Sequence, residues 1–277
     1  GNASTETFSN NGPDTLAALN ADITIGDAVV DYQPGEASNG LVLLTNQYRP
    51  NSEYTAGYIL INGEGEYELG IDVSNEFGDS RGDIFIDSRG DVSVVASGLA
   101  TAAAGEAGDI TVLAQETVRF DSLDRNGNFV PGGAVSGVIN LEGLEGSQEL
   151  AALLTLPEAS VIERLNVLES IDVIEGRAGN IRISAENLEL LNGVLLNADT
   201  ILGTGDAGNI TLDVEDTIRF SGIGFDDIDN RNVSSFISSS TVKGGSAGNI
   251  SLTANTVEVL DGSAILAFSV ASDNNAG

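Results

Sequence analysis

A four-residue word, Ala-Gly-Asn-Ile or Ala-Gly-Asp-Ile, recurs along this chain at intervals that constrain its fold. The copies stand at Ala107–Ile110, Ala178–Ile181, Ala207–Ile210 and Ala247–Ile250, and a bare Ala276-Gly277 follows where a fifth would begin. Their glycines, at 108, 179, 208, 248 and 277, are separated by 71, 29, 40 and 29 residues. Recurrence at such a period is typical of proteins whose chain winds into stacked coils.

Each word opens a block in which apolar and polar residues alternate. After Gly179, for example, Ile181, Ile183 and Ala185 fall on one side of an extended chain. This period of two, rich in β-branched residues, predicts a strand with one buried face. A second short strand follows, and a third apolar stretch begins in equivalent places at Leu196, Phe236 and Ile265.

Three short strands per repeat, joined by turns too small for a crossover helix, predict an all-β fold. We expect a right-handed parallel β-helix (β-solenoid) with a short helical insertion, in which equivalent strands stack about 4.8 Å apart. Insertions aside, roughly 25 residues per coil would give about 11 coils and a rod on the order of 50 Å long. A sandwich or an up-and-down barrel would need hairpin turns, whereas the Asn-Gly and Asp-Gly pairs here recur in register with the coil.

The repeated word has a structural interpretation. Its glycine permits the positive φ of a sharp turn, and its small alanine lets coils approach closely. We expect Asn180, Asn209 and Asn249 to stack as an amide ladder, each bonded to its neighbours. The second strand reads Leu-Glu-Leu-Leu and Val-Glu-Val-Leu in the Ala178 and Ala247 blocks, but Thr-Ile-Arg-Phe and Thr-Val-Arg-Phe in the other two. This one-residue change of register predicts a β-bulge.

Residues 1–277 are interpreted as a single β-solenoid. Residues 1–106 are expected to form degenerate coils, and 107–277 hold the clear repeats with insertions at 121–133 and 222–233. The interval of 71 exceeds a 40-residue repeat by about 31, and the surplus includes 146–170, which reads as a short helical hairpin packed on the rod. Because the sequence starts and stops within a repeat, we expect it to be an interior piece of a longer protein.

The two insertions are rich in oxygen ligands that suit Ca²⁺. The candidates are Asp124, Asn126 and Asn128 in the first insertion and Asp226, Asp227 and Asp229 in the second. The Asp-x-Asn-x-Asn spacing can wrap a hard cation, but Val135 stands where a closing glutamate is usual. Turns also favour Asp, Asn and Gly, so ordinary turn chemistry is the alternative. No other cofactor is expected.

Two Arg-Gly-Asp tripeptides, Arg81–Asp83 and Arg89–Asp91, match a short cell-attachment motif of some adhesins. Each directly precedes an expected strand, as the Ala-Gly-Asp turn does. We therefore interpret both as turns.

The charge excludes some partners. With 42 acidic and 11 basic residues, the net charge of −31 repels nucleic acid and anionic membranes. No apolar run is long enough to span a bilayer, so membrane insertion is not expected. The absence of cysteine rules out disulfides and thiolate metal sites.

Tandem Ala-Gly-Asn-Ile words with inserted Phe-Asp-Asp and Asp-Arg-Asn-Gly-Asn loops resemble the repeat region of filamentous-haemagglutinin-like exoproteins. These belong to the two-partner secretion family, and its cyanobacterial members look most similar. The resemblance covers Ala107 to Gly277 well and residues 1–106 weakly. It implies a right-handed β-helix, export through an outer-membrane partner, and service as an adhesin or extracellular fibre. The family's Asn-Pro-Asn secretion motifs do not occur in this sequence, and no catalytic residues carry over.

The leading hypothesis is therefore a non-catalytic, secreted structural or adhesive protein of the cell surface, whose coils form a stiff rod or filament. Self-association, end to end or laterally, and surface or matrix glycans are its expected partners. One alternative is a polysaccharide-active β-helix enzyme using the Asp226, Asp227, Asp229 and Arg231 cluster. Another is a Ca²⁺-stabilised spacer within a larger adhesin.

Overall fold

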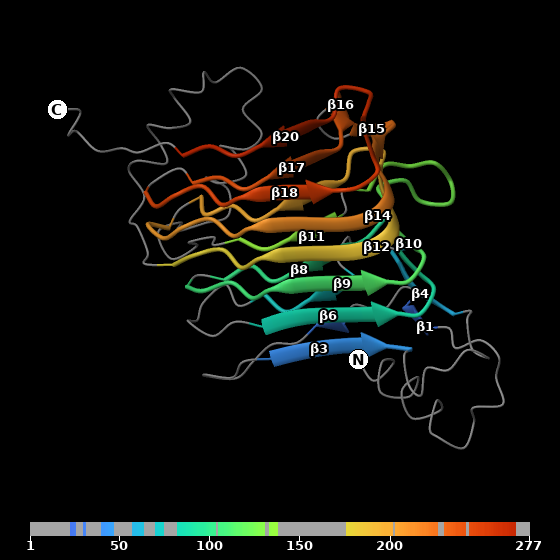
Figure 1. Ribbon diagram of the computed structural model, residues 1–277, viewed down its shortest axis with the longest axis horizontal. Coiled ribbons are helices and arrows are strands. Elements are labelled where there is room, and N and C mark those ends of the chain that lie inside the picture. Colours follow the sequence, from blue (N-terminus) through green and yellow to red (C-terminus); the bar gives the residue numbers. More distant parts are fainter. Residues whose placement is uncertain are drawn as a thin grey trace.

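The computed structural model describes residues 23–25, 30–31, 40–46, 57–63, 70–74, 82–103, 105–130, 133–137, 176–201, 203–226, 230–241 and 244–269. All regular structure in these ranges is β-strand (Figure 1). The same ranges contain no helix of the length and apolarity that a membrane crossing needs. The predicted helical excursion at 146–170 lies outside the described residues, so it stays a prediction.

Three rows of parallel strands run along the molecule, and the chain visits them in the same order in every coil. The first row contains β3 (Gly40–Thr45), β6 (Gly82–Ser88), β9 (Ile110–Ala114), the first parts of β12 (Ile181–Leu191) and β14 (Ile210–Ser221), and β18 (Ile250–Thr253). The second contains β1 (Ile23–Ile25), β4 (Tyr58–Asn62), β7 (Asp91–Val95), β10 (Thr117–Asp121), the later parts of β12 and β14, and β19 (Thr256–Val259).

The third row is a separate seven-stranded parallel sheet. It contains β2 (Val30–Asp31), β5 (Ile71–Asp72), β8 (Gly98–Ala100), β11 (Gly133–Val135), β13 (Leu195–Asn197), β17 (Phe236–Ser238) and β20 (Ala264–Leu266). The first two rows belong to one 11-stranded sheet, because β12 and β14 each extend across both. Successive turns of the chain therefore stack on one another, a solenoid-like arrangement of parallel strands (Figure 1).

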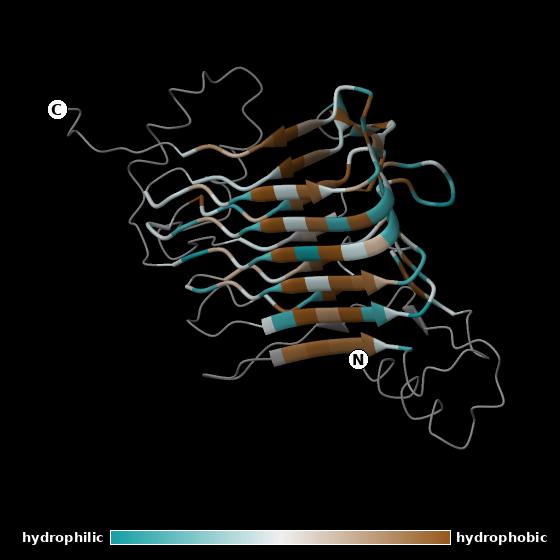
Figure 2. Cartoon of the chain, viewed as in Figure 1, coloured by the Kyte–Doolittle hydropathy of each residue, from teal (hydrophilic) through white to brown (hydrophobic). Residues whose placement is uncertain are grey.

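The alternating pattern places apolar side chains inside. Along β12, buried and more exposed residues alternate over the first five positions, with Ile181 and Ile183 both 0% exposed. Ile181 pairs with Ile110 on one side and Ile210 on the other, so identical side chains stack along the axis. Figure 2 shows the resulting bands of hydrophobic and hydrophilic colour on the strands. The interior is thus a continuous stack of aliphatic residues, with Phe120 and Phe220 among the largest.

The long interval between the first two words is a single coil step. Ile110 pairs directly with Ile181, so no further coil lies between them. Residues in the insertions lengthen a coil without adding another one. In the part of the chain that the structure describes, the third row therefore contains seven strands. The estimate of about 11 coils, which assumed no insertions, is too high.

The predicted bulge is confirmed. Ala185 pairs with Val214, but Asn187 pairs with Thr217, so β14 holds one more residue than β12 at this point. The extra residue brings Phe220 into register with Leu190. In the third row Leu196 and Ile265 are equivalent as expected, because both pair with Ile237. Phe236 is out by one residue, because it pairs with Leu195.

The glycine of the repeated word is needed for close approach, and the expectation of a positive φ is wrong. Gly108, Gly179 and Gly208 are not among the residues with positive φ. A Cβ atom on Gly208 would instead overlap the carbonyl oxygen of Gly179, and one on Gly179 would overlap that of Gly108. Each glycine therefore leaves room for the main chain of the coil before it.

We predict that Gly208→Ala destabilises the protein by about 1–3 kcal/mol, because the added methyl must push two coils apart. Gly244→Ala is the matched control, since its Cβ would lie 3.6 Å from the nearest atom, Thr204 O, and its φ is not positive. The control should be neutral or up to about 1 kcal/mol stabilising. Urea denaturation of the two variants measures both effects, and equal midpoints would contradict the close-approach explanation.

Candidate functional site

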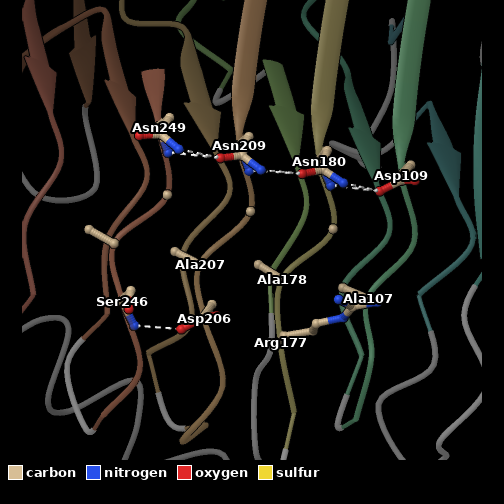
Figure 3. Close-up of a pocket in the computed structure, with 14 residues that line it drawn as sticks. Ala107, Asp109, Arg177, Ala178, Asn180, Asp206, Ala207, Asn209, Ser246 and Asn249 are labelled. Carbon is tan, nitrogen blue, oxygen red and sulfur yellow. Dashed lines mark hydrogen bonds between the residues drawn. The ribbon is translucent and has the colours of Figure 1, made fainter. Parts of the chain in front are cut away.

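The predicted amide ladder is present at the corner where each coil enters the first row (Figure 3). The Nδ2 amide of Asn209 donates to Oδ1 of Asn180 at 3.1 Å, and that of Asn249 donates to Oδ1 of Asn209 at 3.2 Å. The backbone N–H of each asparagine donates to the same oxygen, at 3.0 and 2.9 Å. Every step thus joins two coils through both a side chain and the main chain.

The ladder has a direction, and Asp109 stands at its foot. Asn180 donates through Nδ2 and through its backbone N–H to Asp109 Oδ1, at 3.0 and 2.7 Å. A carboxylate only accepts hydrogen bonds, so Asp109 can receive from the following coil but cannot pass a side-chain bond to the preceding one. Only its backbone N–H continues the series, donating to Asp83 Oδ1 at 2.9 Å. The change from Asn-Ile to Asp-Ile in the repeated word marks this end of the ladder.

A shallow groove of about 330 Å³ runs beside the ladder. One wall consists of Asp109, Asn180, Asn209 and Asn249, and the other includes Arg177, Asp206 and Ser246 (Figure 3). Alanine and glycine residues of the repeated words form its floor. The Ser246 N–H donates to Asp206 Oδ1 at 2.7 Å, and Arg177 pairs with Glu106 at 3.5 Å. Polar side chains therefore line the walls of the groove, and its floor carries only small residues.

The first insertion folds around the carboxylate of Asp124. Its two oxygens accept hydrogen bonds from the backbone and side-chain amides of Asn126 and Asn128, at 2.8–3.3 Å. The Asn128 side chain contributes most to lowering the pKa of Asp124 below its usual 3.8. The structure thus brings these three candidate Ca²⁺ ligands together, in a turn where the asparagines present N–H groups to Asp124. Calcium binding there stays a prediction.

The second insertion forms an antiparallel hairpin of β15 (Ile223–Asp226) and β16 (Arg231–Ser234). This hairpin was not foreseen from the sequence. Asp226 pairs with Arg231 at 3.7 Å across it. Asp227 and Asp229 lie outside the described residues, so their role as candidate ligands is untested.

The two insertions contact each other on one side of the stacked coils. The ring of Phe129, from the first insertion, lies so close to Gly224 of the hairpin that a Cβ there would overlap it. The same ring approaches Gly193, in the turn of the intervening coil. The insertions therefore form one lateral projection, although they lie about a hundred residues apart in the sequence.

A buried polar cluster, which sequence reasoning missed, lies beside the third row. Asp199 accepts hydrogen bonds from Ser238 Oγ at 2.7 Å and from the Ser240 N–H at 2.6 Å. Desolvation by burial is the largest influence and raises the pKa of Asp199, although these hydrogen bonds oppose it. The run Ser238–Thr241, polar where a third-row strand ends, was the available sequence signal.

Outward-facing charges on the second row alternate in sign from coil to coil. Arg119, Glu189, Arg219 and Glu258 occupy equivalent positions in successive strands. Arg119 lies 3.8 Å from Glu189, and Arg219 lies 3.7 Å from Glu258. Exposed pairs of this kind contribute little stability, about 0–1 kcal/mol each. A shift of one or two residues would still remove the pairing, because Arg119 would then lie beside an uncharged residue of β12.

The aspartates of both Arg-Gly-Asp tripeptides have structural partners. Asp91 Oδ1 accepts the Thr117 N–H at 2.9 Å, much as Asp83 accepts that of Asp109. Arg89 is only 2% exposed, and Arg81 lies outside the described residues. Arg89 and Gly90 form a bend directly before β7, in agreement with the turn interpretation. Gly82 and Asp83 belong to β6, so the turn interpretation is wrong for these two residues.

No protein-family model, curated protein or solved structure matches this chain.

We predict that the ladder tolerates a carboxylate only at its foot. Asn209→Asp removes the donor to Asn180 and should cost about 1 kcal/mol, the usual net value of a hydrogen bond. Asp109→Asn keeps the acceptor for Asn180 and adds a donor toward Asp83, so it should be neutral or stabilising. Thermal unfolding of the two variants decides the matter. If both shift the melting temperature equally, the ladder has no direction.

We also predict a pH dependence that originates at Asp199. Because its pKa is raised in the folded state, the native protein binds this proton more tightly than the unfolded chain. The free energy of unfolding should therefore fall as pH rises from about 3.8 through the folded-state pKa. Urea denaturation across this window should show this fall in the free energy of unfolding in the unmodified protein and in the exposed control Asp213→Asn. If the same fall is also seen in Asp199→Asn, it does not originate at Asp199.

Proposed function

We propose that this protein is a right-handed parallel β-helix that serves as a non-catalytic structural or adhesive rod outside the cell. The observation that carries the proposal is the continuous coil-to-coil register, in which the ladder, the core and the alternating charges all repeat at the same step. The right hand follows from the strong preference of parallel strand connections for that chirality.

The use made of acidic groups supports a structural role. Asp83, Asp91 and Asp109 each accept a main-chain N–H from the next coil, and Asp226 is paired with Arg231. Carboxylates held in this way fix the coils to one another. Hydrolysis of a polysaccharide would instead need two carboxyl groups facing one substrate bond.

The extracellular setting rests on the resemblance of the repeated words and insertions to filamentous-haemagglutinin-like exoproteins. Under this proposal the chain is exported by a two-partner system and stands on or outside the cell surface. The high negative charge is compatible with a soluble rod whose coils do not associate with anionic membranes.

The edge formed by β18, β19 and β20 can receive a further coil, and end-to-end association of copies is one way to supply it. Val257 and Val259 occupy the inward-facing register of Ile218 and Phe220, yet they are 45% and 42% exposed against 0%. A parallel edge of this kind can accept another coil by main-chain hydrogen bonding. Head-to-tail addition of copies through unlike surfaces produces an open filament.

Electron microscopy of the purified protein tests this proposal. We predict rods whose lengths are multiples of a single unit and increase with protein concentration. Val257→Glu should shorten them, because it places a charge on the surface that a second copy would bury. Thr253→Glu, which adds the same charge to an exposed position facing away from the core, is the control. Uniform single rods at every concentration would contradict self-assembly.

A further inference from the structure

We propose that the groove beside the amide ladder binds an uncharged, extended β-1,4-linked glycan lying along the rod axis. The inference rests on the proposed extracellular role and names the site and the ligand class within it. Its volume of about 330 Å³ falls in the range of small-molecule sites. Unlike a compact pocket, this space runs across four successive coils, from Asp109 to Asn249.

The ladder wall offers hydrogen-bond donors at regular spacing. An asparagine side-chain amide has two N–H donors, and each rung uses one of them along the ladder. The carbonyl oxygens of Asn180 and Asn209 already accept two hydrogen bonds each. Asn180, Asn209 and Asn249 are exposed, so one N–H per rung is left for a ligand.

The opposite wall offers acceptors. Asp206 is exposed, and its carboxylate receives the Ser246 N–H on one oxygen, which leaves acceptor capacity on the other. The Ser246 hydroxyl can both donate and accept. Donors on one wall and acceptors on the other suit a sugar chain, whose two edges carry hydroxyl and ring oxygens.

The spacing favours a glycan over a peptide. Coils repeat at about 4.8 Å, whereas an extended peptide advances about 3.3 Å per residue and falls out of step with the rungs. A β-1,4-linked hexopyranose chain advances by about one coil spacing per sugar and turns each sugar over relative to the one before, so every second sugar presents the same edge to a given wall. Four rungs span about 14 Å, which matches about four sugars.

The charge of the site selects an uncharged chain. Asp109 and Asp206 line the groove. The basic residue of the lining, Arg177, is paired with Glu106. An anionic glycan would meet both carboxylates and the net charge of −31. The small floor residues leave space for the flat face of a sugar ring.

Calorimetry with cello-oligosaccharides tests the inference. We expect cellotetraose to bind, cellobiose to bind at least about tenfold more weakly, and chains longer than about four sugars to gain little more. The analogue of cellotetraose built from uronic acids should not bind. Absence of cellotetraose binding, or equal binding of the anionic analogue, would overturn the proposal.

Variants locate the site. Ser246→Leu projects a larger side chain over the groove and should abolish binding. Thr253→Leu adds the same bulk to an exposed position on β18 outside the groove and should bind normally. Circular dichroism melts confirm that each variant is folded. Equal binding by Ser246→Leu and Thr253→Leu would place the glycan elsewhere and contradict the assignment.

A measurement without mutation gives an independent check. Cellotetraose should shift the NMR signals of the side-chain amides of Asn180, Asn209 and Asn249, while that of Asn192, which donates to Asp121, stays in place.

If Ser246→Leu alters the lateral pairing of rods in micrographs and no sugar binds, the groove is a contact between copies and the proposal is wrong. Rods that assemble without binding sugar would overturn this inference alone and leave the proposed function standing.

Discussion

The spacing between coils, set by main-chain hydrogen bonds between parallel strands, is the constraint on which the rest of this structure depends. At that distance the corner of each coil has no room for a Cβ, so Gly108, Gly179 and Gly208 lie against one another's backbones. The same spacing brings each asparagine within hydrogen-bonding distance of the one before it. The aliphatic core stacks at this step too, with Ile181 between Ile110 and Ile210. One repeat distance therefore satisfies backbone, side-chain amides and core together.

These three uses of the spacing reinforce one another. The ladder asparagines are exposed, and isolated exposed hydrogen bonds contribute little. Here each bond accompanies a main-chain bond to the same oxygen, so ordering one rung orders the next. The alternating charges of Arg119, Glu189 and Arg219 add a preference for this register over a shifted one. Stability in such a stack is close to a sum over neighbouring coils, so a substitution acts mainly on the coils it touches.

Much of this fold could be predicted from the sequence, because its determinants are local and repeated. The alternation after each glycine gave the strands, the asparagines gave the ladder, and a one-residue difference between blocks gave the bulge at Ala185. The reason for the glycine could not be obtained in this way. A positive φ and a close approach both require glycine, and only the position of Gly179 against Gly208 separates them.

The two insertions and the polar cluster at Asp199 were less predictable, because they depend on contacts between distant segments. The oxygen-rich residues 222–233 looked like a loop, yet they form a hairpin whose Gly224 packs against Phe129 of the other insertion. The sequence of neither segment alone predicts this contact. The cluster at Asp199 likewise depends on Ser238 and Ser240 from the next coil. Sequence spacing indicates where such departures occur, and the stacking of coils determines what they meet.

Disulfide trapping across the longest interval tests the central claim, that Asn180 stacks directly on Asp109 despite the 71 residues between them. The chain has no cysteine, so a pair introduced as Thr111→Cys and Arg182→Cys reports only on that contact. These outward-facing partners lie on adjacent parallel strands, within disulfide reach. Thr111→Cys with Thr211→Cys is two coils apart, about 9–10 Å, and out of reach. The account predicts rapid oxidation of the first pair alone. Cross-linking of the second pair in its place, or of neither, would contradict it.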